Sequence, residues 1–173
     1  MVEFALSIFL FLFLILGVVE FGYFIFIYGS VFSASREAVR YGSSVGTNAL
    51  GVAHEKDCAG IRDAALRIAG FAGITPANVD IRYDKGPDDP RPWADLPTCE
   101  SNPATQLGDR INVQIQIGYQ PLVGLIPPTT IQSQDARTII KEVDINPDFS
   151  VPTAVSPTST SSPAATTTPE PEH

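Results

Sequence analysis

The sequence predicts an α+β protein, in which a long N-terminal helix packs on a small antiparallel β-sheet and a disordered Ser/Thr/Pro-rich tail follows. Three observations predict it. Residues 1–28 are almost wholly apolar, residues 111–119 alternate between apolar and polar side chains, and residues 151–173 hold ten Ser or Thr and five Pro. We expect four segments: a transmembrane helix (1–28), its amphipathic continuation (29–47), a globular head (48–146) and a flexible tail (147–173).

The apolar N-terminal run predicts a helix that spans a membrane. Only Glu3, Ser7 and Glu20 interrupt it. At 1.5 Å per residue the helix would be about 40 Å long, which exceeds the thickness of a bilayer core. A cleaved signal peptide is the alternative, but no Lys or Arg precedes Arg36 and no Ala-x-Ala site follows the run.

The helix is expected to continue with one apolar face. At 100° per residue, apolar and polar side chains fall on opposite arcs, as in a helix that lies on a globular domain. The apolar arc consists of Val31, Phe32, Ala34, Ala38, Val39, Tyr41, Gly42 and Val45. We expect the helix to end where Gly42, Gly46 and Asn48 follow.

The head is expected to contain a second helix and three strands. The helix would run from about residue 57 to 72, with Asp57 as its N-cap. Its apolar face would consist of Ile61, Ala65, Ile68 and Ala72. Alternation predicts strands at 79–83 and 111–119, and a mixed pattern predicts a third between 131 and 143. The amphipathic half of the long helix would cover the apolar face of this sheet.

The two cysteines, Cys58 and Cys99, are sufficient for one disulfide. Because the rest of the chain indicates export, we favour a bridge over two unrelated buried thiols. The bridge would tether the proline-rich segment 85–103, for which we expect no regular structure. The aspartates near this segment suggest a calcium loop, but their spacing does not match the EF-hand pattern, so we expect no metal site.

Residues suited to catalysis or nucleic-acid binding are scarce. The net charge of −8 would repel phosphate backbones, so we expect no nucleic-acid partner. His54 and Glu55 begin a zinc-protease motif, but no second histidine stands four residues later. The chain has no Gly-rich phosphate loop and no Cys-x-x-Cys. We therefore expect no enzyme, no catalytic residue and no cofactor.

The two glutamates in the apolar run are the most informative polar residues. A carboxylate at the bilayer centre costs about 2.5–3.5 kcal/mol, so it usually has a partner or a function. In a bundle of copies, Glu20 would bind a neighbour's Tyr23 or Tyr28 hydroxyl. Alternatively, Glu20 extends toward water and the tyrosines mark the membrane interface. Three small residues would let such helices approach closely: Gly17, Gly22 and Gly29.

The C-terminal segment has too little apolar surface to fold by itself. Its composition suits an O-glycosylated stalk or, equally, a bare flexible tail. The candidate O-glycosylation sites are Thr158, Ser159, Thr160, Ser161 and Ser162.

Three short motifs lie within the first 45 residues. They are Val2-Glu3-Phe4-Ala5-Leu6, Val19-Glu20-Phe21-Gly22 and Ala34-x-Arg36-Glu37-Ala38-x-Arg40-Tyr41. In combination they resemble the TadE-like family of pilins and pseudopilins, which is type IV pilin-like and part of the tight-adherence system. A weaker similarity is the sequence Gly108-Asp109-Arg110 before the alternating strand.

The resemblance implies a precursor with a short basic leader that a prepilin peptidase removes. The subunit would then stay in the cytoplasmic membrane until an assembly platform adds it to an extracellular filament. The resemblance also implies that Glu3 pairs with the N-terminal amine of a neighbouring subunit. In the family this glutamate is the fifth mature residue, whereas here only Met1 and Val2 precede it. Either two residues are missing from the start, or Met1 is not the mature N-terminus.

Three functions are consistent with these features. We expect a structural subunit of an extracellular Tad-type pilus, which polymerises with copies of itself through its N-terminal helix. The first alternative is a minor pseudopilin that primes or assists pilus assembly or secretion. The second is a membrane-anchored surface module that binds a ligand through the Trp93 loop.

Overall fold

The computed structural model describes residues 2–124 and 126–141. The tail expected over residues 147–173 lies outside the described residues. So do its candidate glycosylation sites, Thr158, Ser159, Thr160, Ser161 and Ser162.

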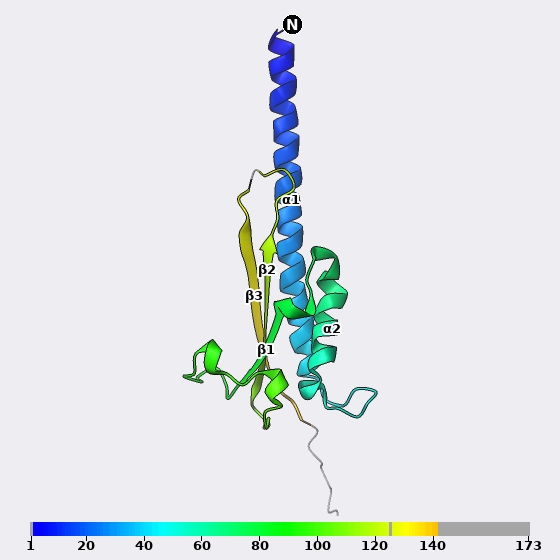
Figure 1. Ribbon diagram of the computed structural model, residues 1–173, viewed down its shortest axis with the longest axis vertical. Helices are drawn as coiled ribbons and strands as arrows, with labels where there is room; N and C mark the ends of the chain where they lie inside the picture. Colours follow the sequence, from blue (N-terminus) through cyan, green and yellow to red (C-terminus); the bar gives the residue numbers. More distant parts are fainter. Residues whose placement is uncertain (1, 125, 142–173) are drawn as a thin grey trace, which may run out of the picture. The chain divides into compact units, whose positions relative to one another are not determined.

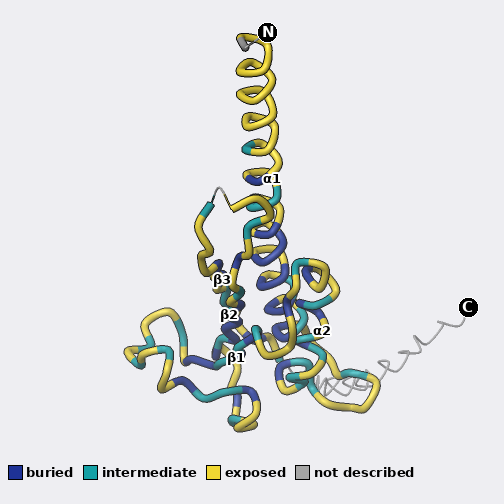
Figure 2. Tube along the Cα trace, turned by 45° about the horizontal axis from the view of Figure 1, so that its top comes forward, coloured by how far each residue is buried: buried dark blue, intermediate teal, exposed yellow. Residues whose placement is uncertain are grey.

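The helix α1 (Val2–Gly42) is one uninterrupted element, and it ends at Gly42, before the end of the continuation expected over residues 29–47. Its N-terminal half exposes its apolar side chains, and its C-terminal half enters the core of the head (Figure 2). The side chains of Val31, Ala34 and Ala38 are fully buried, as the amphipathic pattern predicts. Phe32 was predicted on the buried arc but is exposed, and the guanidinium of Arg36 lies over its ring.

The second helix, α2 (Cys58–Ala69), begins one residue after its predicted N-cap. The Asp57 carboxylate accepts a hydrogen bond of 2.9 Å from the Gly60 N–H, as expected of a cap. A short 3₁₀ turn, η2 (Gly70–Ala72), follows the helix. The prediction that Ile68 faces the core was wrong: Ile68 is exposed, and the small side chains of Ala64 and Ala69 are buried beside Ile61 and Ala65. The residues that it buries are Ile61, Ala64, Ala65 and Ala69.

The sheet consists of three antiparallel strands in the order β1-β2-β3. They are β1 (Val79–Asp84), β2 (Arg110–Tyr119) and β3 (Thr129–Thr138). All three were predicted, although β3 begins and ends earlier than the sequence pattern suggested. One face of the sheet is apolar and carries buried side chains from Val79, Ile81, Tyr83, Ile111, Val113 and Ile115.

The apolar face of the sheet is covered by helix, which confirms the α+β fold class (Figure 1). α1 lies against β2 and β3 and also packs against α2. The Ser35 and Ser133 hydroxyl groups share a hydrogen bond of 2.8 Å between α1 and β3. At the end of α1, a Cβ on Gly42 would lie 2.4 Å from Cδ1 of Ile111. A side chain at this position would therefore require the buried Ile111 side chain to shift.

The segment 85–103 is better ordered than its composition suggests. It contains two 3₁₀ turns, Trp93–Asp95 and Cys99–Ser101. Arg82 fixes the first turn by donating hydrogen bonds to the carbonyl oxygens of Trp93 and Ala94, at 2.8 and 2.9 Å. The predicted disulfide is confirmed: it joins Cys99 to Cys58, the first residue of α2.

Candidate functional site

The strongest candidate site is the point where α1 enters the head. Glu20 is only 1% exposed, although it lies in an otherwise apolar stretch of helix. Its Oε1 accepts a hydrogen bond of 2.8 Å from the Tyr119 hydroxyl, and its Oε2 accepts one of 2.7 Å from the Val123 N–H. Both carboxylate oxygens are therefore bound by the head of the same chain.

Tyr119 ends β2 with its side chain on the apolar face, so its ring packs on α1 while its hydroxyl reaches Glu20. The ring lies edge-on to Phe24, with centroids 5.1 Å apart, and tilted against Tyr23 at 5.9 Å. Burial and the hydrogen bond to Glu20 raise the pKa of Tyr119 to about 12. The phenol is thus a neutral donor at any physiological pH, and its contact with the carboxylate is an enclosed, water-excluded hydrogen bond.

The loop after β2 supplies the second donor. Its first residues lie beside α1, where the Val123 N–H reaches Glu20, above the level of the sheet in Figure 1. Because the carboxylate lies between the strand end and this loop, one side chain connects α1 to two parts of the hairpin. We call the group Glu20, Tyr119 and Val123 the junction.

The sequence identified Glu20 but not its partners within the chain. Of the two tyrosines proposed as partners in a neighbouring helix, Tyr23 packs on the ring of Tyr119, and Tyr28 is exposed. The signal for Tyr119 was present: a tyrosine at the buried end of an alternating strand needs a partner for its hydroxyl. The signal for Val123 was absent, because any non-proline residue can donate its backbone N–H.

The other predicted assembly residues, Glu3 and three glycines, also lie on α1. Glu3 is exposed in its first turn. Gly22 and Gly29 are exposed and Gly17 is half-buried. A Cβ built on any of these glycines would meet no atom within 4 Å among the described residues. The fold of the single chain therefore gives no steric reason for glycine at these three positions.

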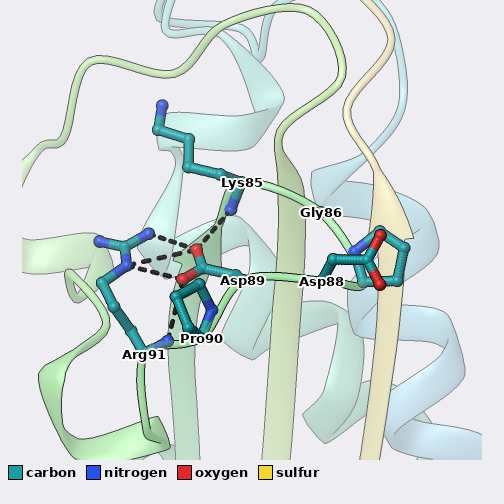
Figure 3. Close-up of a pocket in the computed structure, with 7 residues that line it drawn as sticks. Lys85, Gly86, Asp88, Asp89, Pro90 and Arg91 are labelled. Carbon is teal, nitrogen blue, oxygen red and sulfur yellow. Dashed lines mark hydrogen bonds and ion pairs between the residues drawn. The ribbon is translucent and has the colours of Figure 1, made fainter.

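A separate open pocket, of about 400 Å³, lies over residues 85–91 (Figure 3). Its central carboxylate, Asp89, accepts hydrogen bonds from the Arg91 guanidinium and from the Lys85 N–H. The pKa of Asp89 is below its usual value. The hydrogen bond from the Arg91 side chain has the largest effect, and the backbone N–H groups that bind the carboxylate add to it. These contacts use the carboxylate to hold the turn closed.

The neighbouring aspartate, Asp84, is also bound within the chain. Its carboxylate accepts hydrogen bonds of 2.8 and 2.6 Å from Arg110 and one of 2.8 Å from Asn112. Across the part of the chain that the structure describes, no three His, Cys, Asp or Glu side chains are grouped so as to hold a metal ion.

Trp93, the proposed contact residue of a binding module, is half-buried against β1. Its indole N–H donates a hydrogen bond of 3.0 Å to Asp80, and the Arg82 guanidinium lies 5.5 Å from its ring centroid. The indole therefore serves to attach its loop to the edge of the sheet.

The long helix carries the three sequence motifs, exposes apolar side chains over its first half and enters a small head at Glu20. Residues 1–40 match the TadE-like protein family. The match covers nearly all of α1 and confirms the resemblance found in the sequence. The match therefore indicates that this helix is similar to the helix of proteins in Tad pilus systems. No curated protein and no solved structure matches the chain.

Proposed function

We propose that this chain is a structural subunit of a Tad-type pilus, anchored in the membrane by α1 and then polymerised through the same helix. One observation carries the proposal. α1 is long and apolar enough to span a membrane, and only 6% of its most apolar stretch is buried within the chain. Apolar surface on this scale is unfavourable in water, so it requires lipid or other apolar helices around it.

The glycines of the TadE-like helix support close helix packing. A glycine within a helix costs about 0.5–1 kcal/mol relative to alanine, and the single chain provides no steric reason for that cost. Gly22 and Gly29 are seven residues apart, which is about two helical turns, so they lie on one side of α1. Both are exposed, on the side away from the head. A neighbouring helix packed closely along this side explains their presence.

The remaining features agree with export and assembly. The Cys58–Cys99 disulfide is typical of a domain that folds outside the cytoplasm. Glu3 is exposed near the start of α1, where it can pair with the N-terminal amine of a neighbour. In this proposal a prepilin peptidase and an assembly platform process and add the subunit, and its role is structural rather than catalytic.

The experiment replaces Gly22 and Gly29 together by leucine and compares fibres sheared from cells with the membranes left behind. We expect the variant to accumulate in the membrane and to be absent from the fibres, because the added side chains separate the helices. The control is Gly118→Leu, at an exposed glycine of β2 whose Cβ would also meet no described atom within 4 Å.

Mass spectrometry of the sheared fibres, with N-terminal sequencing, identifies the subunit and its processed end. A chain that dominates the fibres supports the proposal. Normal fibres from the glycine double variant would contradict helix packing through these residues. If the unmodified chain is abundant in membranes but absent from fibres, it is a minor pseudopilin and not the main subunit.

A further inference from the structure

We propose that the end of the head nearest the N-terminal half of α1 is a lipid-binding surface, which enters the membrane interface while the subunit awaits assembly. We call it the rim and define it by four residues: Phe26 of α1, Phe71 of η2, and Leu122 and Val123 of the loop after β2. The inference rests on the part of the proposed function that inserts α1 into a membrane, and it is independent of filament formation.

The first argument is exposure. Phe71 and Leu122 are 66% and 61% exposed, and Phe26 and Val123 are also exposed. The rings of Phe26 and Phe71 lie 5.2 Å apart, which joins η2 to α1. Val123 is joined to α1 on its sheet side by the hydrogen bond to Glu20. Three elements that are distant in the sequence thus present large apolar side chains around one stretch of the helix.

The second argument is the distribution of charge. The three segments that form this end of the head are residues 21–35, 68–79 and 111–134, and none of them contains a charged residue. Charged side chains concentrate at the opposite end, in ion pairs such as Lys85–Asp109 and Arg110–Asp84. A head that met water on all sides would have no need for such a division, whereas an interface between lipid and water requires it.

The third argument is that the rim is continuous with the apolar surface of α1. Phe21 and Ile25, which follow Glu20, expose side chains as apolar as those before it. Glu20 is the single charged residue between Phe4 and Ser35, and the junction encloses it. A carboxylate that accepts hydrogen bonds on both oxygens can lie at this depth without facing lipid, because the two donors replace part of its solvation by water.

The basic residue nearest to the rim in the sequence is Arg67. Arg67 is exposed in the last turn of α2, four residues before Phe71. Its charge acts on Glu37 and Tyr41 of α1. The rim therefore fits the membrane interface through its aromatic and aliphatic side chains, and the vesicle test below reports their depth.

The test uses the full chain in vesicles of phosphatidylethanolamine and phosphatidylglycerol that carry a doxyl quencher near the top of the acyl chain. Trp93 is replaced by Phe throughout, and a single new tryptophan reports depth in three variants. Leu122→Trp places it on the rim, and Phe11→Trp places it in the exposed half of α1. Leu50→Trp is the matched control, because Leu50 is 87% exposed but follows the far end of α1.

We expect the quencher to reduce the fluorescence of Trp at positions 122 and 11 at least twofold more than at position 50. If position 11 is quenched while position 122 behaves like position 50, the rim is not in the membrane and the inference is overturned. A neighbouring subunit would then be the occupant of the rim. If position 11 is not quenched either, α1 is not inserted, and the proposed function fails at its first step.

Discussion

The Tyr119 hydroxyl donates a hydrogen bond of 2.8 Å to Oε1 of Glu20, joining the end of β2 to the middle of α1. Oε2 of the same carboxylate is held by the Val123 N–H at 2.7 Å. A residue that the sequence suggested for contacts between copies is thus bound within one chain. The role of Glu20 between subunits stays a prediction, and any variant of it must be interpreted together with the stability of the head.

Removing the Tyr119 hydroxyl is expected to weaken the attachment of the head to α1. Tyr119→Phe leaves one oxygen of a buried carboxylate without its donor, so the melting temperature in detergent should fall by roughly 5 °C. Glu20→Ala should lower it further, and the double variant should be no less stable than Glu20→Ala alone. Tyr28→Phe, at an exposed tyrosine, is the control. Additive losses would mean that the two residues act independently.

Two glycines of α1 are expected to respond in opposite directions to the same substitution. Gly42→Ala places a Cβ 2.4 Å from the Ile111 side chain and should destabilise the head by about 1–3 kcal/mol. Gly29→Ala meets no described atom within 4 Å and should stabilise the helix by about 0.5–1 kcal/mol. Thermal unfolding in detergent measures both. Equal effects would contradict the close approach of α1 to β2.

Acid is expected to weaken the head through Asp84. Burial raises the pKa of Asp84, but the hydrogen bonds from Arg110, Asn112 and the Gly86 N–H outweigh it and lower the pKa below its ordinary value of 3.8. The carboxylate therefore stabilises the fold above that value, and this contribution is lost as pH falls through the lowered pKa. In the Asp84→Asn variant, the free energy of unfolding should fall less between about pH 5 and 2 than in the unmodified protein. Asp63→Asn, on the exposed side of α2, should leave this fall unchanged. Parallel curves for all three proteins would exclude Asp84 as a source of the acid sensitivity.

The disulfide is expected to stabilise the head by constraining the unfolded chain. The bridge closes a loop with a sequence separation of 41, so replacing Cys58 and Cys99 by serine should cost about 3–4 kcal/mol in urea unfolding. A reducing agent should destabilise the unmodified protein by a similar amount and leave the double variant unchanged. If the reducing agent has no effect on the unmodified protein, the bridge does not form under those conditions.

The elements of the fold could be predicted because each depends on local periodicity. The apolar run and the arc of Val31, Ala34 and Ala38 indicated α1, and the alternation of residues 111–119 indicated β2. Ile68 was misplaced because α2 lies close enough to α1 to favour alanine at the contact, which a hydrophobicity pattern does not reveal. The contacts of Arg82 with the following loop were missed for a different reason: their acceptors are backbone carbonyl groups, which every residue provides.

The candidate site could be predicted only in part. Glu20 was evident because a carboxylate in an apolar helix is costly. Its partners are tertiary contacts, fixed by the length of β2 and by the path of the loop after it. The family match is confined to residues 1–40 and therefore does not reach the strand and loop that bind this carboxylate.

The junction also sets an order of events during synthesis. Glu20 precedes its two donors by 99 and 103 residues, so the helix leaves the ribosome long before Tyr119 and Val123 exist. Throughout that interval the carboxylate has no partner from its own head, and only a chain whose β2–β3 hairpin has been made and folded can enclose it. A truncated or misfolded subunit therefore keeps an unprotected acidic group in its apolar helix, which distinguishes it from a finished one before any neighbour is met.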